Sequence, residues 1–213
     1  MTNPYKQKLL QAGLSMKDKN LTIETWGNIS IKDPNTNHIY ITPSGMPYDS
    51  ITEEDICVLD QNGNQIEGNR KPSIEKQLHV LIYQTRKDIN AILHTHPIDS
   101  TIFGVLHKNI PVITDEMAQA IGTEVQCTDY ALPGSNQLAK NAVEALGNSK
   151  AVLLSNHGAV CVGKDMQECF KVATVLETSA TIYYKALMIG TPIEIKQEDV
   201  DWMYDFAQNK YGQ

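Results

Sequence analysis

The sequence predicts an α/β fold in which an antiparallel or mixed sheet carries helices on its faces. Segments with apolar residues at helical spacing occur along the whole chain, and short apolar runs of strand length lie between them. The two kinds of segment do not alternate strictly, and several strand-like runs adjoin through tight turns, which favours antiparallel neighbours. The chain has 213 residues, of which 41% are hydrophobic and 20% are charged. This length and composition suit one domain over residues 1–213 with a sizeable core.

The first third of the chain predicts one helix and two pairs of strands. Leucines recur at helical spacing in the first segment, at Leu9, Leu10 and Leu14. Each strand pair surrounds turn residues, and the Asn62-Gly63 step of the second pair accepts the positive φ values that a tight hairpin needs. The predicted elements are a helix over 5–19 and strands over 29–32, 38–42, 57–60 and 65–67.

The remainder of the chain predicts five helices and four strands. Pro72 and Ser73 open a helix with Leu78 and Ile82 on its apolar face, and Ser73 is the expected N-cap because its hydroxyl can accept a backbone N–H. The predicted helices cover 72–86, 101–106, 135–146, 165–189 and 198–209. The predicted strands cover 91–96, 125–127, 151–154 and 159–162.

The charge balance and the cysteine pattern exclude several classes of protein. With 18 basic and 25 acidic residues the net charge is −7, so no basic excess is available to bind nucleic-acid phosphates. No apolar run approaches the roughly 18 residues of a membrane span, and no secretory signal is visible at the start. The four cysteines are widely spaced, which argues against a disulfide framework or a thiolate zinc site. We expect a cytoplasmic protein without nucleic-acid or membrane partners.

Two histidines lie two residues apart at the end of a predicted strand. His94 and His96 therefore point to the same side, so both imidazoles face one point in space. A catalytic zinc ion takes three protein ligands, and His157 is the best third candidate because it also follows an apolar strand. A His-x-His pair also occurs as two solvated side chains at a strand end, and the spacing alone leaves both interpretations open.

Glu75 lies on the first turn of the helix that leads into the His94 strand, with His79 one turn later on the same face. A carboxylate beside a metal ion can act as a fourth ligand, or as a base once substrate displaces it. A first-turn glutamate is also favoured by the helix dipole alone. The position of Glu75 is therefore consistent with either role.

Two glycine-containing turns complete the candidate site. They contain Gly27-Asn28 and Ser44-Gly45. Glycine lets backbone amides approach an anion, and asparagine and serine add further donors, so such turns can bind phosphate. Taken singly, each can also be an ordinary turn.

In this order, these motifs resemble the class II aldolase/adducin-head family over nearly the whole chain. The segments that carry the resemblance are Gly27-Asn28-Ile-Ser, Thr42-Pro-Ser-Gly45, Pro72-Ser73-Ile-Glu75, His79, Tyr83-Gln84, His94-Thr-His96, Ile110-Pro111 and Asn156-His157-Gly158. The resemblance implies a three-layer α/β/α fold with a central, mainly antiparallel sheet. It also implies a homotetramer with the active site, and one zinc ion per subunit, at a subunit interface; Mn²⁺ or Co²⁺ are alternative metals.

The resemblance assigns roles to particular residues. It implies that His94, His96 and His157 bind the zinc, and that Glu75 is the acid/base residue that also touches the metal in the empty site. The phosphate ligands implied are Gly27, Asn28, Ser44, Gly45 and Ser73. Tyr211 is similar to a tyrosine of the family's mobile tail that closes over the site, and Asp115 stands where the family's aldolases carry a tyrosine facing the aldehyde. Tyr130 is a further candidate, and Ile74 replaces a phosphate-side serine.

The activity implied is the reversible cleavage of a ketose 1-phosphate to dihydroxyacetone phosphate and an aldehyde. L-fuculose 1-phosphate or a related deoxypentulose 1-phosphate is the expected substrate. The deoxypentulose 1-phosphate is included because Asp115 departs from the family pattern at the aldehyde end. The alternatives are a pentulose-5-phosphate 4-epimerase, a methylthioribulose-1-phosphate dehydratase and a non-enzymatic module like the adducin head.

Overall fold

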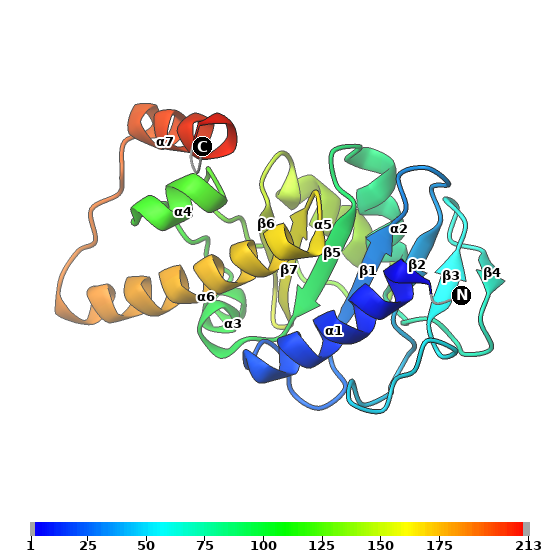
Figure 1. The fold of residues 1–213 in the computed structure, drawn as a ribbon. Helices are drawn as coiled ribbons and strands as arrows, with labels where there is room; N and C mark the ends of the chain where they lie inside the picture. The colour runs from blue at the N-terminus through cyan, green and yellow to red at the C-terminus, as the bar shows by residue number, and fades with distance from the viewer. Residues whose placement is uncertain (1–2, 211–213) are drawn as a thin grey trace.

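A computed structural model describes residues 3–210, which form one seven-stranded sheet with helices on both faces (Figure 1). The strands are β1 (Asn28–Lys32), β2 (Ile39–Ile41), β3 (Cys57–Leu59), β4 (Gln65–Glu67), β5 (Ala91–Thr95), β6 (Ala151–Leu154) and β7 (Gly158–Gly163). Their order across the sheet is β4-β3-β2-β1-β5-β7-β6, and every neighbouring pair is antiparallel. The predicted antiparallel sheet is thereby confirmed.

The helices form two layers around this sheet. They are α1 (Pro4–Asp18), α2 (Lys76–Thr85), α3 (Ile98–Val105), α4 (Asp115–Ala120), α5 (Asn136–Leu146), α6 (Met166–Ile189) and α7 (Gln197–Asn209). Alternate residues of β5 enter two separate cores: Ala91 and Leu93 pack with α1, α3 and α6, whereas Ile92 packs with α2 and α5. This alternation produces the three-layer α/β/α arrangement expected from the sequence.

The predicted helices and the cysteines agree with the structure in most respects. Ser135 and Asp165 act as N-caps of α5 and α6, because their side chains accept the N–H groups of Leu138 and Glu168. All four cysteines are free thiols, as predicted. Within residues 3–210, no helix combines the length and apolar character that a membrane crossing requires.

One predicted element was wrong, and one helix was not predicted. The segment 125–127 is not a strand: Val125 makes one antiparallel bridge with Ile110, and Cys127 makes one parallel bridge with Leu153. The segment therefore pairs with one neighbour at Val125 and with another at Cys127. A strand needs consecutive pairs with the same neighbour, so none forms here. Helix α4 was not predicted, and it is only six residues long, which is too short to show a clear periodicity.

The start of α2 also differs from the prediction, with a consequence for the site. The helix begins at Lys76 rather than at residue 72, and Glu75 occupies its N-cap position. Ser73 is therefore not the N-cap; its hydroxyl accepts the Glu75 N–H at 3.2 Å within the preceding turn. Glu75 consequently lies just outside the helix, and its side chain enters the space between α2 and the sheet.

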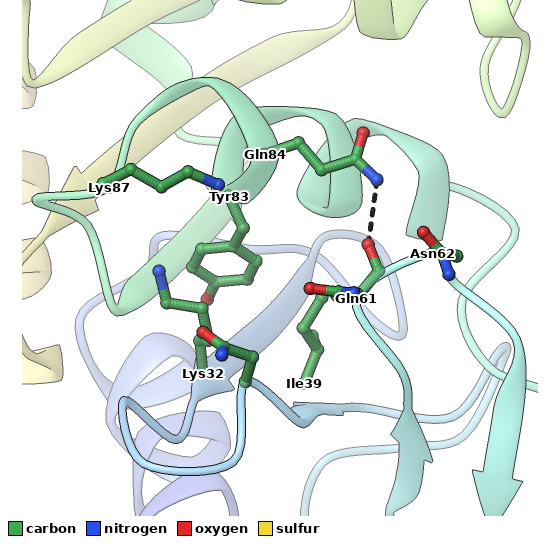
Figure 2. A pocket seen from close by; sticks show the side chains of 8 residues that line it. Lys32, Ile39, Gln61, Asn62, Tyr83, Gln84 and Lys87 are labelled. Carbon is green, nitrogen blue, oxygen red and sulfur yellow. Dashed lines mark hydrogen bonds between the residues drawn. The ribbon is translucent and has the colours of Figure 1, made fainter.

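Strand β1 presents a polar stripe to α2. Asn28, Ser30 and Lys32 alternate with residues of the opposite core, so all three face the helix, and Lys32 stacks over the Tyr83 ring at 5.2 Å (Figure 2). Alternate residues of a strand are about 6.6 Å apart, and residues one turn apart on a helix are about 6 Å apart. Because these two repeats are nearly equal, successive polar residues of β1 can each meet a polar residue of α2. At the Asn28 end of β1, this polar stripe reaches the predicted metal site.

Candidate active site

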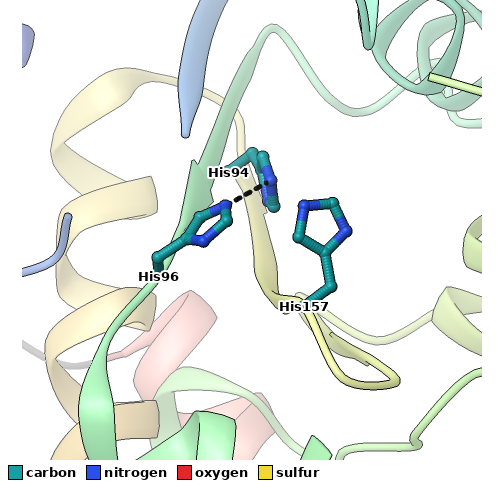
Figure 3. Close-up of side chains that lie close together, drawn as sticks. All are labelled: His94, His96 and His157. Carbon is teal, nitrogen blue, oxygen red and sulfur yellow. Dashed lines mark hydrogen bonds between the residues drawn. The ribbon is translucent and has the colours of Figure 1, made fainter. Parts of the chain in front are cut away.

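Three imidazoles converge at one end of the sheet. His94 is the fourth residue of β5, His96 follows two positions later, and His157 lies in the turn immediately before β7. Because Thr95 pairs with Ala159 across β5 and β7, the end of one strand meets the start of the other. The ring centroids are 4.8 to 4.9 Å apart, and Figure 3 shows the three rings facing a common point.

The hydrogen bonds of His94 leave one of its nitrogens directed at this point. His94 Nδ1 is 3.0 Å from the Ala159 carbonyl, which can only accept, so Nδ1 carries the donated proton. His94 Nε2 then lies 3.1 Å from both His96 Nε2 and the Glu75 Oε2 atom. Imidazoles held in this way by a backbone carbonyl are typical metal ligands, because the bond fixes the tautomer and the ring.

The carboxylate of Glu75 completes the group. Its Oε1 atom is 3.6 Å from His157 Nε2 and is buried without a hydrogen-bond partner. Within residues 3–210, His157 Nδ1 is a second buried atom of this group without a hydrogen-bond partner. Three imidazoles and a carboxylate with an unpartnered oxygen form a donor set of the kind that binds a divalent transition-metal ion, so these residues fit a metal site.

The protonation states favour metal binding. Burial, together with the neighbouring His94, lowers the pKa of His96 to about 3 and that of His157 to about 4, so both rings are neutral at pH 7. Burial alone would raise the pKa of the Glu75 carboxyl, but the charge and hydrogen bond of His94 outweigh it, and the pKa lies below its usual range. At neutral pH the site therefore offers an ionised carboxylate and neutral imidazoles at His96 and His157. Burial alone would lower the pKa of His94, but the Glu75 carboxylate outweighs it and raises that pKa.

Two glycines allow the backbone to close around the histidine strand. A Cβ atom at Gly27 would lie 2.5 Å from the His94 carbonyl oxygen, and one at Gly158 would lie 2.2 Å from the Thr95 carbonyl oxygen. Strands β1 and β7 therefore approach β5 more closely than any side chain would permit. Gly27 also has a φ of +74°, which L-residues rarely adopt.

A Gly27→Ala substitution is expected to destabilise the protein by about 2 kcal/mol or more, because it combines backbone strain with a clash against His94. The matched control is Gly45→Ala: Gly45 has a similar φ of +69°, but no atom lies within 4 Å of its Cβ position. Urea unfolding of both variants separates the clash from the strain. Equal losses of stability in the two variants would contradict the close approach to His94.

A cavity of about 370 Å³ opens above the imidazoles and brings together most of the residues implied by the sequence. Its lining consists of Thr25, Trp26, Gly27, Asn28, Pro43, Ser44, Gly45, Ser73, Ile74, Glu75, His96, Pro133 and His157. All five predicted phosphate ligands are in this set, while His94 is buried beneath the cavity. Trp26 and Pro133 line the cavity but were not predicted. The sequence carried a signal for Trp26, because this tryptophan lies directly before the Gly27 turn.

A buried chain of hydrogen bonds leads from this cavity into the protein. Asn28 Nδ2 donates to Glu75 Oε2 at 2.9 Å, since a carboxylate can only accept, and Asn28 Oδ1 must then accept from His79 Nε2. His79 Nδ1 in turn accepts from the Ser30 hydroxyl at 2.6 Å, and Tyr83 lies 2.9 Å from that hydroxyl. Burial lowers the pKa of His79 to about 3, so the ring is neutral at pH 7. A neutral ring carries one N–H, as this series of hydrogen bonds requires.

Two candidates are not brought to the cavity, and a third lies outside the described residues. Asp115 is exposed in the first turn of α4, which packs against α6 and α7. Tyr130 is exposed and is not part of the cavity lining. Tyr211 lies outside the described residues, 3–210.

Comparison with known proteins agrees with the resemblance read from the motifs. The class II aldolase and adducin N-terminal domain family matches residues 7–184. The chain is 35% identical to 5-deoxy-D-ribulose 1-phosphate aldolase from Bacillus thuringiensis serovar kurstaki, over 92% of each chain. It is 40% identical to L-fuculose phosphate aldolase from Methanococcus maripaludis, over 78% of this chain and 89% of the relative. A solved structure of an L-fuculose 1-phosphate aldolase superposes with a TM-score of 0.95 at 35% identity, covering 98% of both chains.

Proposed function

The chain belongs to the class II aldolase and adducin N-terminal domain family, and we propose that it cleaves a ketose 1-phosphate reversibly to dihydroxyacetone phosphate and an aldehyde. The observation that carries this proposal is the convergence of three imidazoles and the Glu75 carboxylate beside the cavity. The similar proteins from B. thuringiensis and M. maripaludis support it, since both are named as sugar-phosphate aldolases. Their names make L-fuculose 1-phosphate and 5-deoxyribulose 1-phosphate the first substrates to test.

We propose that the metal is zinc and that His94, His96 and His157 hold it, with Glu75 in contact when substrate is absent. When bound, the ion supplies Lewis-acid stabilisation of the negative charge that develops on the ketose oxygens as the C3–C4 bond breaks. The unpartnered buried Oε1 atom of Glu75 supports a cation at this position.

Glu75 is the proposed acid/base residue. In the direction of synthesis, its carboxylate takes a proton from the carbon beside the carbonyl of dihydroxyacetone phosphate; in cleavage it returns this proton to the same carbon. The two carboxylate oxygens are suited to different tasks, because Asn28 holds Oε2 at 2.9 Å while Oε1 has no hydrogen-bond partner and is available for the proton.

The phosphate of the substrate is proposed to lie on the opposite side of the cavity. Gly27, Asn28, Ser44, Gly45 and Ser73 supply backbone amides, hydroxyls and a side-chain amide there. Gly45 has nothing within 4 Å of its Cβ position, so an anion can approach its backbone closely. The other hydrogen of the Asn28 amide is free for this purpose, because His79 and Glu75 fix the amide's orientation.

His79 is a positioning residue in this account, and His79→Phe is expected to lower kcat by roughly 10- to 100-fold. Without the His79 N–H, the Asn28 amide can rotate, so Glu75 loses its fixed donor while all three histidine ligands remain. His79→Gln retains an N–H donor and should recover part of the activity. The measurement is kcat per zinc-loaded, folded subunit. A purely structural role would leave that value unchanged and lower only the yield of folded protein.

We further propose that the protein is a homotetramer with the active site at a subunit interface. The C-terminal end of α6 supports this, because it extends beyond the sheet (Figure 1) and ends in strongly exposed apolar residues, including Met188 at 78% and Ile189 at 92% exposure. In such an assembly a neighbouring subunit can supply Asp115 to the aldehyde end, where the proton of the C4 hydroxyl must be removed. Tyr211 keeps its proposed role as a residue that closes over the site.

The proposed function is tested by the release of dihydroxyacetone phosphate, coupled to glycerol-phosphate dehydrogenase. L-fuculose, L-rhamnulose, D-ribulose and 5-deoxyribulose 1-phosphates form the panel, each with and without a chelator. We expect chelator-sensitive release from at least one of them, and the ranking identifies the aldehyde preference. No release from any of the four by zinc-loaded protein would contradict the aldolase and favour the epimerase or the dehydratase.

A further inference from the structure

A second hollow lies at the opposite end of β1 from the candidate active site. Its volume is about 160 Å³, and Figure 2 shows it beside Tyr83, between the start of β2 and the end of α2. Its polar lining consists of Lys32, Lys87 and the side-chain amides of Asn37, Gln61, Asn62 and Gln84. The hollow contains two cations and several amide donors, and no acidic residue lines it.

Lys32 is an unusual residue in this lining. It is only 7% exposed, yet within residues 3–210 its ammonium group has neither a hydrogen bond nor an ion pair. Its interaction with the protein is the cation–π contact with Tyr83 at 5.2 Å. The stem of this side chain is buried, whereas its ammonium nitrogen keeps solvent contact at the hollow, where an anion can replace water as its partner.

The surrounding charges do not supply a partner for this lysine. Lys87 adds a second positive charge, and burial together with Lys87 lowers the pKa of Lys32. Asp88 is the nearby acid that acts in the opposite sense, but both of its oxygens are bound by Arg86, at 2.9 and 2.7 Å. The hollow therefore keeps a local excess of positive charge in a protein whose net charge is −7.

We propose that this hollow is a binding site for a small tetrahedral oxyanion, inorganic phosphate, separate from the active site. The ammonium groups of Lys32 and Lys87 would supply the opposite charge, and the amides of Asn37 and Asn62 would donate hydrogen bonds to the remaining oxygens. The volume suits a free ion rather than a sugar phosphate, whose carbon chain would extend into solvent. The proposal does not depend on the aldolase function, because no active-site residue takes part.

The test is a titration of the zinc-loaded protein with inorganic phosphate, followed by the backbone amide NMR signals of both regions. We expect the signals around Lys32, Asn62 and Lys87 to shift and saturate. Lys87→Gln should weaken this binding by roughly tenfold, and Lys32→Gln by at least as much. Lys87 is exposed, so its variant should fold normally, and Lys140→Gln on α5 is the matched control that should bind as the wild type does. Glycerol 3-phosphate in place of phosphate tests whether an organic phosphate can enter.

Phosphate is also expected in the active-site cavity, so the two sites must be separated. Ser44→Asp places a negative charge in that cavity and should abolish the shifts there while leaving those at Lys87 intact. Crystals soaked in tungstate, a tetrahedral anion with strong anomalous scattering, should show a peak between Lys32 and Lys87. Three results would each overturn the proposal: no shift and no peak at this hollow, unchanged binding in both lysine variants, or loss of the hollow's shifts in Ser44→Asp. If wild-type protein shows phosphate shifts at the hollow but none in the active-site cavity, only the phosphate subsite of the proposed function is contradicted.

Discussion

Replacing Glu75 by glutamine is expected to lower turnover by a factor of about 10³ while the metal remains bound. Glutamine has nearly the same shape and keeps an oxygen that can accept from Asn28, which donates to Glu75 at 2.9 Å. It cannot take a proton from carbon, so the acid/base step is lost. The three histidine ligands are unchanged, and the metal content should stay at one ion per chain.

The comparison needs both activity and metal analysis on the same sample. Glu144→Gln, at an exposed position on α5, is the matched control and should retain wild-type turnover. If Glu75→Gln turns over at more than about a tenth of the wild-type rate with a full metal content, Glu75 is not the base. If metal is lost as well, Glu75 acts chiefly as a ligand.

Removal of the metal is expected to abolish cleavage altogether, and added zinc should restore it. His157→Ala should have the same effect without recovery, because only two imidazoles would hold the ion once substrate displaces Glu75. Burial and His94 lower the pKa values of His96 and His157 to about 3 and 4 and keep these two ligands neutral, whereas Glu75 raises the pKa of His94. Acidification should therefore release zinc first through protonation of His94.

Metal content by mass spectrometry and activity after dialysis against a chelator provide the measurements. His38→Ala is the matched control, since His38 is a histidine away from the imidazole cluster and should leave both values unchanged. Full activity in metal-free protein would contradict the proposed chemistry. Wild-type zinc affinity together with wild-type activity in His157→Ala would contradict the ligand set.

The sequence predicted the fold where a periodicity was long enough to be recognised. Helices α1, α5 and α6 and the strands of the central sheet follow clear apolar spacings, and β5 was found from its run of apolar residues before His94. The segment 125–127 was wrong because its residues favour a strand, but whether a strand forms depends on a partner that continues alongside it. Helix α4 was missed because six residues give too little pattern.

The candidate site was predictable to a similar degree. His94 and His96 share a face because strand residues alternate, and His157 was inferred from a second strand end; the structure places β7, rather than β6, beside β5. The chain from Glu75 through Asn28 to His79 was not predicted. It depends on the match between the spacing of β1 and that of α2, which arises only when the two elements pack together.

We propose that the metal and Glu75 together activate the carbon beside the carbonyl of dihydroxyacetone phosphate. Proton exchange at that carbon tests it without any aldehyde: the protein is incubated with dihydroxyacetone phosphate in D₂O, and the loss of the hydroxymethyl proton signal is followed by NMR. We predict exchange of one of the two hydrogens by zinc-loaded wild-type protein, and none by chelated protein or by Glu75→Gln. Absence of exchange in the zinc-loaded wild type, with dihydroxyacetone phosphate bound, would contradict the account.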